Sequence, residues 1–268
     1  MASGWTGGQF SILRVLVGLA CVACMNDAGW FSVPDGWAVE SLAARSMGWV
    51  PWVTGLIAVV ALPAFVLGYR SRLAALLIAL VVTCRTALPP HQTPTAFLLV
   101  VVLVVMALHP PAPFLSWAAR GRMDPGGGWE RPDWLQHFAR FLVAFLLPVT
   151  ALLRLTPIGG LAGLAPEADG IILARQWVAA VAFVAPGMMF LRTRRVAWCV
   201  LVLGWLALAL LGADGPTLVP IALLLLLAAE PQWLPRAPTP APAQLLYDGS
   251  CGLCHRTVRF LLAEAPGD

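Results

Sequence analysis

The sequence contains no lysine, and charged residues make up only 11% of its 268 residues. Soluble domains carry about 25% charged residues, and 60% of this chain is hydrophobic. The composition therefore excludes a water-soluble globule, a disordered chain and a coiled coil. The missing lysine also excludes a Schiff base, a lysine general base and the lysine of a phosphate-binding P-loop.

Every basic residue other than histidine is an arginine, and 17 arginines against 13 acidic residues give a net charge of +4. The arginines form no basic stripe with interleaved aromatic residues, so we expect no nucleic-acid partner. In the loops of a chain that crosses a membrane several times, arginine is instead an orientation signal.

Eight apolar runs divide most of the chain. A crossing helix needs about 20 apolar residues, so the runs predict an all-α polytopic membrane protein with about eight transmembrane helices in a lipid bilayer; seven or nine remain open. The first run lacks the cationic start and the cleavage site of a signal peptide and is expected to be retained. The runs are residues 10–25, 49–69, 73–88, 95–108, 134–155, 171–191, 196–211 and 218–229.

Arginine is distributed unequally between the loops that separate these runs. The loops after even-numbered runs hold Arg70, Arg72, Arg120, Arg122, Arg131, Arg192, Arg194 and Arg195. The other loops hold Arg45, with Arg85 and Arg154 at their borders. Because positive charge marks the cytoplasmic side, we expect an integral membrane protein, of a bacterial inner membrane, with both termini in the cytoplasm.

The composition changes near residue 230. Residues 1–230 are the predicted membrane domain, and residues 231–243 are rich in proline and alanine, which is typical of an extended linker. Residues 244–268 begin a second domain: 244–247 predict a strand, Asp248 lies in a turn, and a helix is expected from Cys251.

The most compact chemical motif is Cys251-x-x-Cys254 at the start of that expected helix. A helix N-terminus carries partial positive charge, which favours the thiolate of Cys251, the attacking species in disulfide exchange. Cys254 lies one turn further and would close the disulfide that releases the substrate. Arg256 adds positive charge, so the motif predicts a dithiol that exchanges disulfides with protein partners.

Three other interpretations of the motif stay open. Cys251, Cys254 and His255 spell the attachment pattern of c-type haem, although no methionine follows as a second axial ligand. A zinc site would need a second pair of ligands, so no metal is expected. The two cysteines could also be incidental.

Residues 245–262, with the sequence YDGSCGLC at residues 247–254, resemble the opening of the DCC-motif thiol-disulfide oxidoreductase-like family, whose signature is YDG-x-C-x-x-C. The resemblance implies a thioredoxin-like fold. Because the sequence stops at Asp268, we expect only a fragment of this α/β domain.

The membrane domain resembles the HTTM family, a transmembrane domain shared with vitamin K-dependent gamma-carboxylase-like proteins. Residues 13–15, 18–19, 67–73 and 192–195 carry the resemblance. In that family the base is a lysine near the end of the fifth span, where this chain has Arg154. Arginine stays protonated in proteins, so gamma-carboxylation is not expected.

Charged residues inside apolar runs are candidates for function because their burial is costly. Arg85, close to His91, and Arg154 form a possible ligand site, where Arg85 would hold an anionic headgroup or a quinone oxygen; no cofactor is expected otherwise. The sequence thus predicts a membrane-anchored thiol-disulfide oxidoreductase. The alternative is a non-redox transporter or lipid-handling protein with a non-functional tail.

Overall fold

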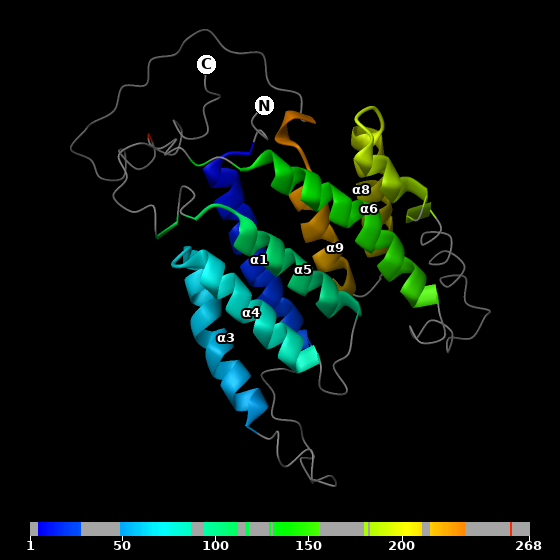
Figure 1. The fold of residues 1–268 in the computed structure, drawn as a ribbon. Helices are drawn as coiled ribbons and strands as arrows, with labels where there is room; N and C mark the ends of the chain where they lie inside the picture. The colour runs from blue at the N-terminus through cyan, green and yellow to red at the C-terminus, as the bar shows by residue number, and fades with distance from the viewer. Residues whose placement is uncertain are drawn as a thin grey trace. The chain divides into compact units, whose positions relative to one another are not determined.

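The computed structural model describes residues 5–27, 49–86, 94–111, 116–117, 129, 131–155, 180–181, 183–210, 215–233 and 258. Within these ranges the fold is all-α (Figure 1), with seven α-helices and two short 3₁₀ helices. The α-helices are α1 (Gly7–Asp27), α3 (Val50–Leu67), α4 (Ser71–Thr86), α5 (Pro94–Leu108), α6 (Asp133–Leu155), α8 (Arg194–Leu210) and α9 (Gly215–Ala228). The 3₁₀ helices are η4 (Ala185–Met189) and η5 (Pro231–Trp233).

The chain divides into two compact units. The first comprises Met1–Val81, Leu103–Asp133 and Glu230–Asp268, and the second comprises Val82–Val102 and Trp134–Ala229. Helix α1 packs against α3 in the first unit, and α8 packs against α9 and η4 in the second.

The prediction of about eight transmembrane helices is wrong. Among the described residues only Gly7–Met25, within α1, forms a helix both long and apolar enough to cross a membrane. The apolar helices at 52–67, 96–108 and 218–228 are shorter, and two of them are about as short as the apolar runs that predicted them, 95–108 and 218–229. At 1.5 Å per residue, a helix of 15 residues such as α5 measures about 22 Å, less than the roughly 30 Å of a bilayer core.

The predicted sixth span shows one such interruption. Its described part, residues 180–181 and 183–191, ends in η4 and a turn, and Pro186 and Gly187 lie within η4. Proline removes a backbone donor and glycine weakens a helix, and at Pro186-Gly187 the run does not continue as one α-helix. Single prolines are tolerated elsewhere, because Pro63, Pro148 and Pro220 lie inside α3, α6 and α9. Apolar content alone therefore overestimated helix length.

The predicted α/β fragment at the C-terminus is also corrected, because the described residues form helices and no strand. In that part of the chain only Val258 is described, as a buried helical residue. The predicted strand at 244–247, Cys251 and Cys254 lie outside the described residues.

Helix α1 begins at a reciprocal cap. The Gln9 N–H donates to Thr6 Oγ1 at 3.2 Å, and the Thr6 N–H donates to Gln9 Oε1 at 3.3 Å. This Thr-x-x-Gln arrangement is a capping box, which satisfies donors that a helix N-terminus otherwise leaves free. The cap fixes the start of the helix that contains Gly7–Met25, the apolar segment long enough to cross a membrane.

Helix α3 ends in a Schellman motif. Gly68 has a φ of 74°, and the N–H groups of Gly68 and Tyr69 donate to the Phe65 and Ala64 carbonyls. The next carbonyl, that of Val66, accepts a 3.3 Å hydrogen bond from Arg14 Nε of α1. A short turn through Arg70 then starts α4, which lies beside α3 in Figure 1.

Side chains of the second unit satisfy carbonyls of α9 in the same way. Gln136 Nε2 of α6 donates to the carbonyls of Ala228 and Ala229 at 2.8 and 3.1 Å. On α8, Trp198 and Trp205 lie seven residues apart and so on one helical face. Their indole N–H groups donate to the carbonyls of Leu225 and Leu218, also seven residues apart. These paired bonds run in opposite chain directions and fix an antiparallel register between α8 and α9.

We predict that Gly68→Ala destabilises the protein by about 2 kcal/mol or more. A non-glycine residue at a positive φ costs about 1–3 kcal/mol, and an added Cβ would lie 2.5 Å from Ser116 Cβ. The control is Gly55→Ala in the same helix, where a Cβ meets nothing within 4 Å; it should stabilise the helix by about 0.5–1 kcal/mol. Thermal unfolding in detergent, followed by circular dichroism, gives both values. Equal effects of the two substitutions would contradict the role assigned to the turn.

Candidate functional site

Most of the predicted site residues lie outside the described part of the chain. Cys251, Cys254, Asp248, Arg256 and His91 are all among them. The structure therefore neither brings these residues together nor separates them, and their assignments stay predictions.

The two predicted intramembrane arginines are placed at helix ends. Arg85 lies in the last turn of α4 and is buried, with 7% of its surface exposed. The backbone of Arg154 belongs to the last turn of α6, and its side chain is not described. His91 is not described either, so the possible ligand site that these three residues were predicted to form stays a prediction.

The cysteines that the structure describes are all free thiols. Cys21 is buried and Cys24 half-buried in α1, Cys84 is half-buried in α4, and Cys199 is exposed on α8. Residues three apart in a helix share a face, but Cys21 and Cys24 form no disulfide. Within the described residues, no group of three histidine, cysteine or acidic side chains could hold a metal ion.

The first unit contains a buried polar cluster where α1, the α3–α4 turn and the end of α5 meet. We define it by the buried residues Phe10, Arg14, Gly68, His109, Ser116, Trp129 and Arg131, with the exposed Arg72 at its edge. It is unusual because charged and polar side chains lie among apolar helices, where burial without partners is costly.

Arg14 is the most deeply buried charge of the cluster, with 1% of its surface exposed. Its Nε donates to the Val66 carbonyl, whereas its Nη1 is buried and has no hydrogen-bond partner. A Cβ added at Gly68 would lie 2.7 Å from Nη1. The guanidinium therefore lies directly beneath the α3–α4 turn, and only glycine leaves room for it there.

His109 follows the last residue of α5 and is also buried. Its Nδ1 lies 2.8 Å from the Val105 carbonyl, and because a carbonyl only accepts, Nδ1 carries the proton. Nε2 is then an acceptor, and it is buried without a partner. Burial, followed by the charge of Arg131, lowers the pKa of His109 to about 3, against the opposing effect of the Val105 bond. The imidazole is thus neutral at physiological pH.

Aromatic rings and a second arginine enclose His109. Phe10 stacks on the imidazole with centroids 4.3 Å apart, and Trp129 lies 5.0 Å from Phe10. Arg72 Nε donates to the His109 carbonyl at 2.9 Å, and Trp129 Nε1 donates to the Pro110 carbonyl at 3.1 Å. The chain that leaves α5 is thereby held against the start of α4.

Comparison of the chain with known families, with curated proteins and with solved structures finds no match. The two family resemblances drawn from short motifs therefore stay predictions. The geometry of the cluster has to be interpreted from its own chemistry.

Neither Arg14 nor His109 was among the site residues predicted from the sequence. A signal for each was present. His109 is a lone polar residue between the apolar run of α5 and Pro110-Pro111, and Arg14 is a lone charge in the first apolar run. What the sequence did not show is that both belong to one cluster.

We predict that the stability of the protein falls below pH 6.5 because of His109. The pKa of an unfolded histidine is about 6.5, well above the folded value, so the unfolded state binds the proton first as the pH drops. His109 then favours folding fully above pH 6.5, and this contribution is lost towards pH 3 with a slope of up to about 1.4 kcal/mol per pH unit. Thermal unfolding at pH 7.5, 6 and 4.5 measures the slope.

His109→Gln should flatten this dependence, since glutamine does not titrate. The control is His137→Gln, which replaces an exposed histidine of α6. A slope that survives in His109→Gln, or that disappears in the control, would contradict the assignment.

Proposed function

We propose that this chain is a membrane-anchored thiol-disulfide oxidoreductase, with α1 in the bilayer and the Cys251–Cys254 dithiol in the aqueous phase. The anchoring is supported by α1, which is long and apolar enough to cross a membrane. The redox activity is supported by the sequence motif around the two cysteines.

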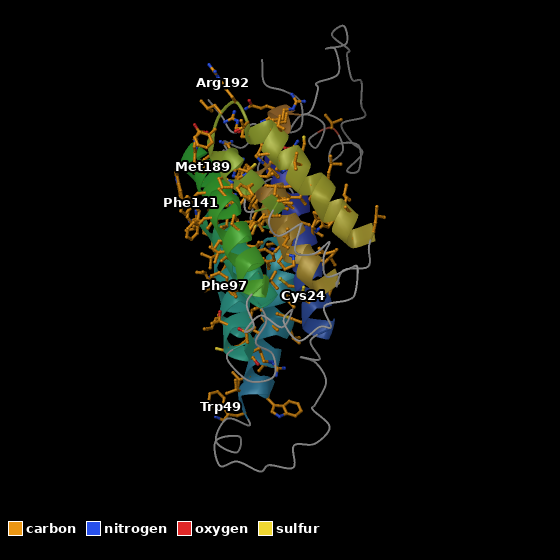
Figure 2. The ribbon with its side chains drawn as sticks, turned by 90° about the vertical axis from the view of Figure 1, so that its right-hand side faces the viewer. Cys24, Trp49, Phe97, Phe141, Met189 and Arg192 are labelled. Carbon is orange, nitrogen blue, oxygen red and sulfur yellow. The ribbon has the colours of Figure 1, made fainter. Side chains whose placement is uncertain are left out.

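The outward faces of the helices support the anchoring further. One side of α1 is buried in the first unit, and the opposite side exposes Ile12, Leu16 and Leu19. On α3, Trp52, Leu56, Val59, Val60 and Leu67 are exposed at helical spacing, with Leu56 69% exposed. In Figure 2, Phe141 and Met189 of the second unit point away from the ribbon. Exposed apolar stripes of this extent are typical of surfaces covered by lipid or by protein.

The exchange reaction would proceed in two steps. The Cys251 thiolate attacks one sulfur of a substrate disulfide; that disulfide breaks, a mixed disulfide forms, and the departing sulfur takes up a proton. The Cys254 thiolate then attacks the Cys251 sulfur, which closes the internal disulfide and releases the second substrate thiol. Two electrons pass to the substrate, and a thiol reductant is needed to regenerate the dithiol.

A non-redox lipid-handling protein is the second candidate. It is favoured by Arg14, whose Nη1 is buried without a partner inside an apolar helix. Charges in such positions are often part of a binding site. The effect of Cys251→Ser on disulfide reductase activity distinguishes the two candidates, because only the redox function requires this thiol.

For location we propose a bacterial inner membrane, with the arginine-rich segments 70–72, 120–131 and 192–195 on the cytoplasmic side. A cytoplasmic dithiol rests in the reduced state. The protein would then act as a reductant or isomerase of disulfides rather than as an oxidant.

We predict that Cys251→Ser abolishes disulfide reductase activity of the full chain. The assay is reduction of insulin disulfides by dithiothreitol with the purified protein in detergent. Cys254→Ser should accumulate a mixed disulfide with the substrate, because the resolving thiol is missing. Cys199→Ser, which changes an exposed cysteine outside the motif, should keep full activity. Activity that persists in Cys251→Ser, or that is absent from the unmodified protein, would exclude the redox function.

The orientation is tested by a single cysteine placed at Thr193 in a variant without the six native cysteines. Thr193 lies in the exposed turn before α8, among the arginines of segment 192–195. A membrane-impermeant maleimide should label it only after the cells are permeabilised. Labelling in intact cells would place this segment on the periplasmic side and overturn the proposed orientation.

A further inference from the structure

The turn between α3 and α4 concentrates positive charge. Arg14 lies beneath it, and Arg70 and Arg72 are exposed on it. Within the described residues, no carboxylate forms an ion pair with any of these three arginines. Among the described residues, the turn therefore carries positive charge without an acidic partner, at a place that the proposed cysteine chemistry does not use.

The buried charge of Arg14 makes this site more than a pair of surface arginines. Its guanidinium is almost completely buried, and its Nη1 faces Gly68 without a hydrogen-bond partner. A charge among apolar side chains is screened far less than one in water. Its field therefore extends through the turn to the exposed face above it.

The start of α4 adds donors on that face. The first N–H groups of a helix have no intrahelical acceptor and carry the positive end of the helix dipole, and in α4 they belong to Ser71, Arg72 and Leu73. Arg72 Nε is tied to the His109 carbonyl, which holds its guanidinium beside the helix start and leaves its terminal nitrogens for another acceptor. Backbone donors and arginines together are the usual groups that bind phosphate.

The residues around the turn indicate which kind of molecule would carry a phosphate bound there. Leu67, Tyr69 and Trp117 are exposed, and a Cβ at Gly68 would touch Ser116, the neighbour of Trp117. The guanidinium of Arg70 lies 5.9 Å from the centre of the Tyr69 ring. Tyrosine, tryptophan and arginine beside an apolar helix form the composition found at the headgroup level of a bilayer.

We propose that the α3–α4 turn, residues 68–73, binds the phosphate of an anionic membrane lipid, with Arg70, Arg72 and the α4 N-terminus as donors and Arg14 as the buried charge beneath them. The proposal rests on the membrane anchoring proposed above and is independent of the cysteine chemistry. A free phosphate ion shares the same chemistry, so the experiment includes both sources.

The test measures thermal unfolding of the full chain, stripped of lipid, in neutral detergent. Mixed micelles with phosphatidylglycerol should raise Tm by several degrees more than micelles with the same mole fraction of phosphatidylcholine, since a ligand that binds only the folded state stabilises it. Inorganic phosphate alone should have little effect. The variant Arg70→Gln/Arg72→Gln should lose more than half of the phosphatidylglycerol-specific shift.

Control variants show whether the loss of the Tm shift is specific to the arginines of the α3–α4 turn. Arg192→Gln/Arg195→Gln removes the same charge from exposed residues before and in α8 and should keep the shift. Arg14→Leu should reduce the shift if it folds, and the surface pair provides the test if it does not.

Two results would overturn the proposal: equal shifts with both lipids, or an inorganic phosphate shift as large as that of phosphatidylglycerol. The membrane anchoring is tested separately by washing membranes with alkaline carbonate. If the wash extracts the protein, the anchoring is wrong.

Discussion

Backbone carbonyls at helix ends constrain this structure more than any other group. Each α-helix leaves its last carbonyls without intrahelical donors. A buried carbonyl without a donor is costly, so where packing excludes water the donors come from the protein. Arg14 supplies one to Val66 of α3, Arg72 supplies one to His109 after α5, and Gln136 supplies two to the end of α9. Each of these bonds joins residues far apart in sequence. The polar residues of the apolar segments are thus distributed as caps for other helices, and the packing within each unit follows from where they reach.

The same requirement explains why Arg14 and His109 of the buried polar cluster each keep one polar atom without a hydrogen-bond partner. Nε of Arg14 satisfies a carbonyl, and this geometry leaves Nη1 facing a glycine; Nδ1 of His109 satisfies another carbonyl, and this leaves Nε2 as a buried acceptor. An unsatisfied buried group costs about 1–3 kcal/mol. Such a cost is typical of sites that complete their hydrogen bonding with a ligand. The cluster therefore differs from the rest of the described helices, which are mostly apolar.

Composition predicted the helical class of the described residues and the apolar N-terminal helix, because both depend on average hydrophobicity. It failed for the number of membrane-crossing helices, since hydrophobicity does not report where a helix ends. Gly68 adopts a left-handed conformation that stops α3, and Pro186 and Gly187 interrupt the sixth apolar run.

The capping box of Thr6 and Gln9 can be recognised in the sequence from its spacing. The cluster cannot, because the contact between Arg14 and Val66 depends on packing between helices and leaves no local pattern. The α/β expectation rested on a short motif alone, and a motif does not carry the strands around it.

The bond between Arg14 and Val66 also has a consequence for the biosynthesis of the protein. The two residues are 52 positions apart, so the ribosome releases α1 with its guanidinium well before the carbonyl that accepts from it exists. During this interval α1 is an apolar helix with a charge that lacks its carbonyl partner, and burying such a charge is costly. The arrival of α3 supplies the acceptor, and Gly18, where an added Cβ would overlap Val66, allows the two helices to approach closely. Helix α1 is therefore expected to reach its final packing only after α3 has been synthesised.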